Sequence, residues 1–474
     1  MATRLGLRNA RPRTIAAVAL SAIAMAAARF GLADDLDATQ APGAPAQPQP
    51  AQPQSAQPHS ASGQPQTPGP PQPQASPPEK APTGLARWLD PATAPFIPIP
   101  EIDEDPYSGT TVGLIPTFLV TDDQHEIRQI IAPDVIYNQY FGYGARGRVF
   151  SYPSDNTQWS IVGGAKERVE SEFDGEYAAG ILRQDLWSFN ASLVYDRDGS
   201  PRFYGLGNNS HLSGQVNYTD QQKYAQTIIG LNVTHTWQIG YTFRARTVAI
   251  LPGHISGVPS IQEVYPQTTL RAERQEILNR MSITYDTRDD ITAPREGGQW
   301  VVYAGGASSE GMLNATLYSE CGLDGREFWS VGKDGVIAVH VALRYMPGNN
   351  RTHEIPFWAL SSIGGDESII GGDQPLRGFG AGRFVDRNSS SFSAEYRWRI
   401  ATINALSTQV GLELTPFIDM GRVSALMGDD PFSQLHKVAG IGLRGLALPF
   451  VVGYIDAGYG GEGFAIFTGL NYPF

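Results

Sequence analysis

Glycine-rich motifs are the parts of this sequence whose spacing first suggests ligand chemistry. The pattern Gly-x-Gly-x-x-Gly occurs at 142–147, 440–445 and 458–463. Such a loop binds a pyrophosphate only where a strand turns into a helix, because the helix N-terminus supplies the backbone donors. The flanking residues of each motif predict strands on both sides. We therefore interpret all three motifs as glycines within a sheet and expect no nucleotide cofactor.

Other candidates for catalysis or metal binding stand alone in the sequence. The eight His residues lack the His-Glu-x-x-His spacing of a zinc site, and no Gly-x-Ser-x-Gly nucleophile elbow occurs. The acidic segment 122–126 could hold a cation, but its place between two predicted strands favours a solvated turn. We interpret Cys321, inside a predicted strand, as a small packing residue rather than a reactive thiol. These patterns predict a protein that is not an enzyme and holds no cofactor or metal.

Charge and cysteine content exclude two broad classes of protein. The chain has 35 Lys and Arg against 47 Asp and Glu, a formal net charge of −12. This balance argues against a general nucleic-acid binder, which needs a basic surface to neutralise phosphates. A single cysteine excludes a disulfide scaffold. No stretch after residue 30 approaches the ~20 apolar residues of a spanning helix, so a membrane location requires a barrel.

From about residue 110 onward, apolar and polar residues alternate with a period of two. In the segment 336–345, alternate residues are apolar and the residues between them are small or polar. The segments 237–246 and 391–400 repeat the pattern. Since side chains alternate across a strand, these segments predict strands of about ten residues with one apolar and one polar face.

Either a soluble sandwich or a membrane barrel can produce this alternation. Three features favour the barrel: strand lengths near the ~9–11 residues that cross a bilayer, charged residues in mid-strand, and Tyr and Trp on the apolar face. We therefore predict an all-β fold, a transmembrane antiparallel β-barrel over residues 110–474. Seventeen candidate strands are present. Because a barrel with both ends on one side of the membrane has an even number, we expect sixteen.

The last predicted strand, 463–474, ends the chain with an alternating apolar pattern. Its final apolar positions are Leu470, Tyr472 and Phe474. A terminal Phe is the usual last residue of bacterial outer-membrane barrels. We therefore predict that these three residues form a C-terminal assembly signal.

The N-terminal part predicts secretion followed by a spacer. Residues 1–33 combine a basic start, an apolar stretch and small residues suited to signal peptidase, which predicts a cleaved signal peptide. Residues 34–84 are rich in Pro and Gln, and such a composition predicts a disordered linker. Residues 85–109 are expected to be a lead-in segment before the barrel. Together these features predict an integral protein of the bacterial outer membrane, in contact with its lipids.

A loop motif and three other segments carry a family resemblance. The loop sequence Leu376-Arg377-Gly378-Phe379 resembles the Arg-Gly-Phe/Tyr signature of the BamA/TamA-type outer-membrane assembly and translocation superfamily, also called the bacterial surface antigen family. The segments Phe203–Asn208, Asp286–Asp289 and Phe417–Gly421 resemble further motifs of that family, in the same order. The resemblance covers about residues 110–474.

The resemblance implies one site inside the barrel. The family sets its loop Arg against an inward Glu and an inward Asp on the two following strands, which correspond here to Arg377, Glu395 and Asp419. The alternation of these strands also points both carboxylates inward, and a guanidinium binds carboxylates through a planar fork. We expect a structural lumenal lock formed by these three residues. The alternative is an Arg377 exposed at a loop tip.

The resemblance also implies a function and its partners. We expect a barrel that assists insertion or translocation of proteins or other macromolecules through lateral opening between its first and last strands. Family members usually carry periplasmic POTRA modules before the barrel, and the Pro/Gln-rich segment has none, so we expect a member without POTRA domains. Expected partners are client proteins and a periplasmic accessory protein, with no nucleic acid, and the barrel is expected to be a monomer. The alternatives are a passive or plugged pore and a structural envelope barrel.

Overall fold

The computed structural model places most of the chain beyond residue 96. The described residues are 97–105, 107, 109–122, 127–265, 274–310, 314–347, 355–405, 408–426, 428–447, 451–470 and 472–474. The predicted signal peptide, linker and the first part of the lead-in segment lie outside these residues, as does most of the acidic turn 122–126. No helix among the described residues has the length and apolarity to cross a membrane.

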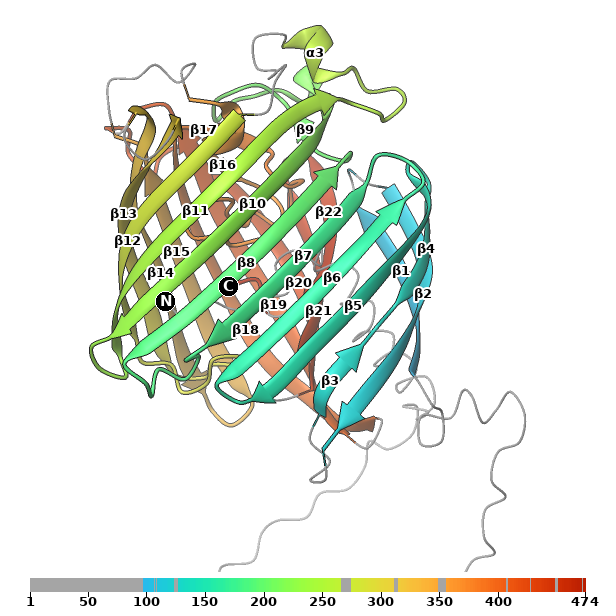
Figure 1. The fold of residues 1–474 in the computed structure, drawn as a ribbon, viewed down its shortest axis with the longest axis vertical. Coiled ribbons are helices and arrows are strands. Elements are labelled where there is room, and N and C mark those ends of the chain that lie inside the picture. The colour runs from blue at the N-terminus through green and yellow to red at the C-terminus, as the bar shows by residue number, and fades with distance from the viewer. Residues whose placement is uncertain are drawn as a thin grey trace, which may run out of the picture.

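The described chain is almost entirely antiparallel strand (Figure 1). The strands of the wall are β1 (Ile97–Asp105), β2 (Gly109–Thr121), β3 (Ile127–Ile131), β4 (Asp134–Asn138), β5 (Gly142–Ser154), β6 (Thr157–Lys166), β7 (Ser171–Ala179), β8 (Trp187–Asp198), β10 (Val216–Asn232), β11 (Trp237–Pro252), β12 (Arg274–Asp286), β13 (Gly297–Glu310), β14 (Asn314–Val331), β15 (Gly335–Tyr345), β18 (Asn388–Ala405), β19 (Thr408–Ser424), β20 (His436–Ala447), β21 (Val451–Gly460) and β22 (Gly463–Leu470). Short elements outside the wall are β9 (Arg202–Phe203), η1 (Leu212–Gly214), α3 (Ile261–Val264), η3 (Phe357–Ala359), β16 (Ser361–Ile363) and β17 (Phe384–Asp386).

The number of strands differs from the sixteen expected. The main sheet contains 20 strand elements among the described residues. Of these, β3 and β4 share one place because both pair with β2 and β5, and β9 is a two-residue addition beside β10. Eighteen places around the wall remain. The lead-in residues 97–105 provide one of the extra strands, because the alternating Ile97-Pro98-Ile99-Pro100 run pairs with β2 despite its prolines.

The predicted alternation of apolar and polar faces is confirmed along the strands. In β8, Trp187, Phe189 and Leu193 are exposed on the outside, whereas Asn190 and Ser192 are buried inside. Inward-facing Arg, Glu and Asp residues occur around much of the wall and are mostly buried. An apolar exterior with a polar interior is the arrangement of a membrane barrel and not of a soluble sandwich.

Aromatic side chains mark the two boundaries of this apolar exterior. A Trp-rich belt lies near the strand ends that border the short turns. Its exposed members are Trp187, Trp237, Tyr285, Trp300, Trp329 and Trp398. Tyr and Phe residues lie near the opposite strand ends, where the Tyr459 and Phe464 rings are 4.9 Å apart. Because the longest connections lie at that second end, we assign it to the outside of the cell and the Trp-rich belt to the periplasmic side.

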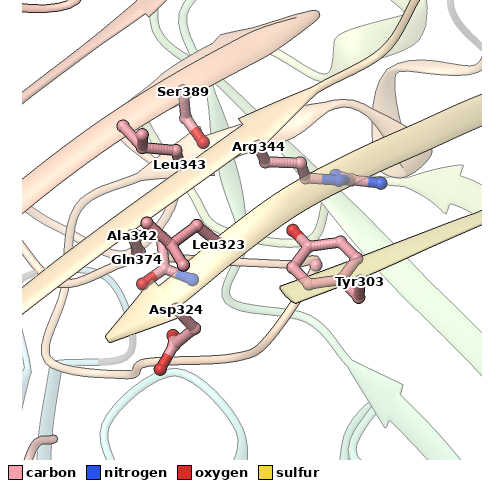
Figure 2. Close-up of a pocket in the computed structure, with 9 residues that line it drawn as sticks. Tyr303, Leu323, Asp324, Ala342, Leu343, Arg344, Gln374 and Ser389 are labelled. Carbon is pink, nitrogen blue, oxygen red and sulfur yellow. The ribbon is translucent and has the colours of Figure 1, made fainter. Parts of the chain in front are cut away.

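The connection between β15 and β18 folds into the barrel. We call its described part, residues 355–387, the lumenal loop; it contains η3, β16 and β17. A narrow gap with almost no free volume remains between this loop and the wall, and Tyr303, Asp324, Arg344 and Gln374 are among the residues that line it (Figure 2). The loop thus fills much of the space beside β13, β14 and β15.

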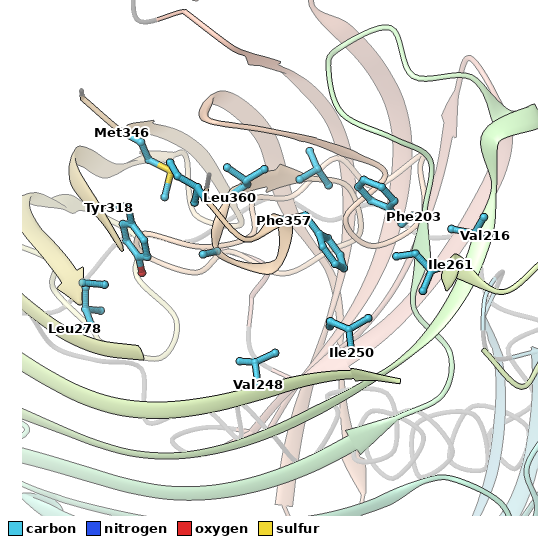
Figure 3. Close-up of a cluster of buried hydrophobic side chains, with 14 residues drawn as sticks. Phe203, Val216, Val248, Ile250, Ile261, Leu278, Tyr318, Met346, Phe357 and Leu360 are labelled. Atoms are coloured by element: carbon cyan, nitrogen blue, oxygen red, sulfur yellow. The ribbon is translucent and has the colours of Figure 1, made fainter. Parts of the chain in front are cut away.

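An apolar cluster anchors the lumenal loop to the outer end of the wall (Figure 3). Within it, the ring of Phe357 lies 4.9 Å from that of Phe203 and 5.4 Å from that of Tyr218. The buried members are Phe203, Val216, Val248, Ile250, Ile261, Leu278, Ala307, Tyr318, Met346, Ile355, Phe357, Ala359, Leu360 and Val385. Burial of this apolar surface stabilises a loop that would otherwise be free to leave the lumen.

The wall has one weak junction, between β1 and β22. All other neighbouring strands share a hydrogen-bonded register. The first and last strands touch, but within the described residues no such register joins them. We call this junction the seam.

Candidate functional site: the lumenal lock

The motif that carries Arg377 is held by backbone contacts of the loop itself. The amide of Leu376 donates to the carbonyl of Gly365 at 2.9 Å, and the amide of Phe379 donates to the carbonyl of Leu376 at 3.0 Å. The side chains of Leu376 and Phe379 are buried in an apolar cluster with Phe417 and other residues. This packing turns the intervening Arg377 toward the wall.

Arg377 is fully buried and binds both carboxylates predicted for it. Its Nε and Nη2 donate to the two oxygens of Asp419 at 2.9 and 2.8 Å, and its backbone amide donates to Asp419 Oδ2 at 3.0 Å. Its Nη1 donates to Glu395 Oε2 at 3.0 Å. The guanidinium also lies 3.7 Å from the centre of the Phe417 ring. The geometry therefore brings the three predicted residues together, away from an exposed loop tip.

The structure adds residues that the sequence interpretation missed. Arg377 Nη1 also donates to Asp456 Oδ2 on β21 at 2.9 Å. Asp456 accepts a further hydrogen bond from Arg444 on β20 at 2.5 Å, and Arg444 donates to Glu395 at 3.1 Å. Asp456 alternates with apolar residues along β21, so strand parity could have placed it inside. The alternation along β21 gave no indication that Asp456 would contact the lumenal loop.

Three arginines and three carboxylates form this buried cluster. The third arginine, Arg397, donates from Nε to Glu395 Oε1 at 2.7 Å. Their charges balance, so the cluster is neutral as a whole. Burial would lower the pKa of Arg377, but Asp419, Asp456 and Glu395 raise it well above its ordinary value. The guanidinium therefore stays charged, and its hydrogen bonds connect the loop to the wall.

Glycines in the wall make room for the motif. A Cβ atom on Gly378 would lie 2.5 Å from the backbone nitrogen of Gly460. A Cβ on Gly458 would collide with the carbonyl of Arg377, and one on Gly460 would lie 2.5 Å from the Phe379 ring. Gly458 and Gly460 of the Gly-x-Gly-x-x-Gly motif at 458–463 thus leave space for the loop to pack against the wall. This motif lies in the hairpin of β21 and β22 and not before a helix.

A second set of contacts ties the loop to the outer end of the seam. Arg383 donates from Nε to Glu462 Oε1 and Oε2, at 2.9 and 2.7 Å, in the turn between β21 and β22. It also donates to the side chain and carbonyl of Ser210 at 2.8 and 2.7 Å. Gly380 of the loop lies against the ring of Tyr107, in the turn between β1 and β2. The loop therefore touches the outer turns on both sides of the seam.

The end of the chain also lies inside the barrel. The predicted strand 463–474 is shorter than expected: β22 ends at Leu470, and Tyr472 and Phe474 are buried. Pro473 cannot donate a ladder hydrogen bond, which is consistent with this end. Tyr472 donates to Glu413 at 2.8 Å, and Arg397 donates to the Phe474 carbonyl at 3.2 Å. The side chain of Leu470 lies outside the described set, and the role of these residues as an assembly signal stays a prediction.

The other candidate chemistry is not assembled into a site. Among the described residues, no group of three or more His, Cys, Asp or Glu side chains is arranged to hold a metal ion. Cys321 lies in β14, partly buried, with Ala304 and Tyr345 as its cross-strand partners. The glycines at 142–147 and 440–445 lie in β5 and β20.

A comparison with solved structures finds similarity to two proteins, among others. One is BamA from Haemophilus ducreyi lacking POTRA domains 1–3, at 13% identity, covering 75% of this chain and 74% of that one, with a TM-score of 0.45. Another is CdiB from Escherichia coli, at 11% identity, covering 79% of this chain and 67% of that one, with a TM-score of 0.48. No curated protein matches the sequence.

A family model gives the decisive comparison. The model of the Omp85 superfamily domain matches residues 166–460, which is more than half of the chain. The matched region includes the lumenal loop, the complete buried cluster and most of the wall. The expected resemblance to BamA/TamA-type barrels is thereby confirmed, and the chain belongs to the Omp85 superfamily of outer-membrane β-barrels.

Proposed function

We propose that this barrel assists the insertion or translocation of proteins or other macromolecules at the outer membrane, by opening its wall at the seam. The seam is the observation that carries the proposal. Wherever else the wall continues, a ladder of hydrogen bonds joins the neighbours, whereas β1 and β22 touch without one in the described chain. An unpaired strand edge offers backbone donors and acceptors to an incoming strand.

The lumenal loop supplies the control that such a seam needs. Arg383 and Gly380 contact the turns at its two sides, and Arg377 holds the loop to β18, β19 and β21. In the proposed mechanism, these ties keep the barrel closed until a client strand competes for the seam. Within the buried cluster, Asp419, Glu395 and Asp456 all bind Arg377 and so help to hold the loop.

Disulfide locking can test the mechanism. A cysteine pair placed across β1 and β22, in a chain carrying Cys321→Ser, should abolish assisted folding of an unfolded eight-stranded outer-membrane barrel into lipid vesicles, and reduction should restore it. The matched control is a pair at the opposed residues Ala457 and Ile466 of β21 and β22, which should leave folding unchanged. Full activity of the oxidised seam variant would contradict lateral opening.

A plugged pore is the alternative that one observation favours. The lumenal loop is tied deep inside the barrel, and the gap left between it and the wall has almost no free volume. If planar-bilayer recordings show steady conductance while the vesicle experiment shows no assisted folding, the passive or plugged pore is the better description. Unchanged outer-membrane protein levels and permeability after gene deletion would instead favour a structural barrel.

The remaining parts of the proposal concern processing and partners. We propose a cleaved signal peptide at 1–33, a monomeric barrel in outer-membrane lipids, and a periplasmic accessory protein that presents clients. We also propose that Leu470, Tyr472 and Phe474 guide assembly of the barrel itself. Replacing Phe474 by Ala should then lower the amount of heat-resistant, folded protein in outer membranes while secretion continues. Equal amounts of the folded variant and wild type would contradict this role.

A further inference from the structure

The connection between β19 and β20 packs against the neighbouring strand β18. We call its residues 429–435 the rim segment. The hydroxyl of Ser390 on β18 donates to the carbonyl of Pro431 at 2.9 Å. The ring of Phe432 stacks on that of Phe392, also on β18, with 5.2 Å between the ring centres. The rim segment is therefore held against one face of the wall.

That face is the outside of the barrel. Along β18, Ser390 and Phe392 alternate with Ser391, whose hydroxyl donates to the carbonyl of Pro375 in the lumenal loop at 3.2 Å. Since successive side chains of a strand point to opposite faces, Ser390 and Phe392 point away from the lumen. The rim segment thus covers part of the wall on its lipid-facing side.

The stack of Phe392 and Phe432 lies within the hydrocarbon layer. Trp398 of the periplasmic belt is six positions from Phe392 along β18, from 392 to 398. Six residues of a strand tilted by about 40° rise roughly 15 Å, and the apolar band of such barrels is about 25 Å high. The Phe392 ring is therefore about 10 Å inside the outer edge of this band, and Phe432 lies beside it.

Phe432 presents its free surface to this layer. Its side chain is 67% exposed although one face of the ring is covered by Phe392. A phenylalanine in water forgoes the free energy of apolar burial, whereas the same ring among acyl chains gains it. The exposed surface therefore fits lipid as its partner.

Polar backbone groups near the stack have partners within the protein, as a position in lipid requires. Arg422 on β19 opposes Ser390 and faces outward with it. Its Nη1 donates to the carbonyls of Asp430 and Ser433 at 2.7 and 3.1 Å. The amide of Phe432 donates to Asp430 Oδ1 at 2.9 Å, and the amide of Ser433 donates to the Asp430 carbonyl at 3.2 Å.

The last residues of the rim segment are tied to the lumen side of the wall. Nδ2 of Asn208 donates to the carbonyl of Gln434 at 2.9 Å. The amide of the preceding Gly207 donates to the carbonyl of Val385 in the lumenal loop at 2.8 Å. Gln434 has a φ of 50°, in the left-handed region, where the chain changes direction. The segment is therefore fixed both outside the wall and on its inner side.

We propose that the rim segment is a lipid anchor, in which Phe432 inserts among the acyl chains of the outer leaflet. Lipid is the partner because Phe432 continues the lipid-facing surface of the wall, where Ile418 and Ile441 are each 50% exposed. The anchor fixes the outer ends of β18, β19 and β20 at a set depth in the membrane. This inference does not depend on the proposed insertion or translocation activity.

Spin-label accessibility can test the anchor in the full-length protein carrying Cys321→Ser, reconstituted into phosphatidylcholine vesicles. A label at Phe432→Cys should meet oxygen often and a water-soluble nickel chelate rarely, as should a label at Ile418→Cys on the lipid-facing wall. A label at Ser256→Cys should show the reverse. Ser256 is exposed in the connection between β11 and α3, and α3 lies beyond the outer ends of the wall strands (Figure 1).

Arg422→Ala removes the donor that holds two carbonyls of the rim segment, so in that background the label at 432 should become severalfold more accessible to nickel. The matched control is Lys437→Ala, an exposed lysine of β20, which should leave the label protected. Heat resistance on gels establishes that each variant is folded.

Two results in the chain with Arg422 intact would overturn the proposal. The first is nickel access at 432 equal to that at 256, which would mean that Phe432 lies in water. The second is low access to both oxygen and nickel, which would mean that protein rather than lipid covers the label. Continued protection in the folded Arg422→Ala variant would overturn the part assigned to Arg422.

Discussion

At the scale of single residues, Arg377 is bound by more groups than a simple ion pair would need. It donates to Asp419, Glu395 and Asp456, and its guanidinium lies on the Phe417 ring. A buried charge is stabilised only when its partners are complete, because the desolvation of each ion must be offset by hydrogen bonds. Loss of one partner should therefore cost more than loss of a surface pair.

Replacing Arg377 by Ala should lower the free energy of unfolding by about 3–5 kcal/mol, since it leaves the buried Asp419 without its cation and removes one cation from Glu395 and Asp456. Urea-induced unfolding in lipid vesicles would measure the change. The control is Arg399→Ala, because Arg399 is about one-third exposed and pairs with Glu413 at 3.3 Å. That variant should lose at most about 1 kcal/mol. Equal losses in the two variants would contradict the buried cluster.

The contact between Arg377 and Asp456 should be visible as energetic coupling. In a double-mutant cycle of Arg377→Ala and Asp456→Asn, the two losses of unfolding free energy should fall short of additivity by about 0.5–3 kcal/mol. Asp324→Asn, which lies elsewhere in the lumen and pairs with His340, should combine additively with Arg377→Ala. Strict additivity of the first pair would show that Asp456 is not part of the cluster.

Strand parity and a family motif together were enough to predict three residues of the site. Glu395 and Asp419 face inward as their alternation with apolar neighbours requires, and Arg377 meets both. Asp456 and Arg444 were missed because parity predicts the face of a strand but not which inward side chains a loop will reach. That information depends on the path of the loop, which no periodic pattern encodes.

At the scale of elements, the lumenal loop and the β20–β21–β22 part of the wall fit each other closely. Gly458 and Gly460 face the backbone and ring of the motif without side chains between them. The close approach lets the loop carbonyls and the Arg377 side chain reach the wall in the same place. The glycines are therefore required by contact with the loop rather than by flexibility.

Replacing Gly458 by Ala should push the motif away from β21, because the new methyl group would collide with the Arg377 carbonyl. Overpacking of this kind costs about 1–3 kcal/mol, measured as a loss of heat resistance or of unfolding free energy. Gly461→Ala is the control three residues away, where a Cβ meets nothing within 4 Å. If both variants match wild type, the loop does not contact the wall at this point.

The tie between Arg383 and Glu462 should hold the outer end of the β21–β22 hairpin. Glu462→Gln weakens two charged hydrogen bonds, so amide exchange in residues 459–463 should become about tenfold faster. Hydrogen-exchange mass spectrometry in lipid nanodiscs would measure it. As a control, Glu327→Gln removes a carboxylate that accepts from Trp300 at the periplasmic side and should leave this hairpin unchanged. Unaltered exchange in Glu462→Gln would show that the tie does not hold the seam closed.

At the scale of the whole molecule, the barrel class follows from sequence and the strand number does not. Alternation, aromatic belts and the charged interior were all foreseeable, because each strand carries its own pattern. Residues 97–105 contain two prolines, which normally mark a segment outside a sheet. They form β1 because an edge strand need satisfy only one neighbour, so the expected lead-in segment adds a strand to the wall.

Removing the centre of the lumenal loop should open the barrel. Replacement of residues 366–382 by a short Gly-Ser linker should raise single-channel conductance in planar bilayers several-fold, since the loop occupies the lumen beside β13, β14 and β15. Circular dichroism and heat resistance would establish that the wall still forms. Conductance equal to wild type in the folded variant would mean that something other than the loop closes the channel.

The close packing of the lumenal loop against Gly458 and Gly460 of β21 has a consequence for building hybrid proteins. A loop grafted from another barrel would bring its own arginine. It could pack against the wall only where the residues of the wall also lack side chains, as Gly458 and Gly460 do. Grafts should therefore exchange the loop together with the hairpin that receives it. These two parts should therefore be exchanged as one unit, although Gly380 of the loop and Ala457 of the hairpin are 77 positions apart in the sequence.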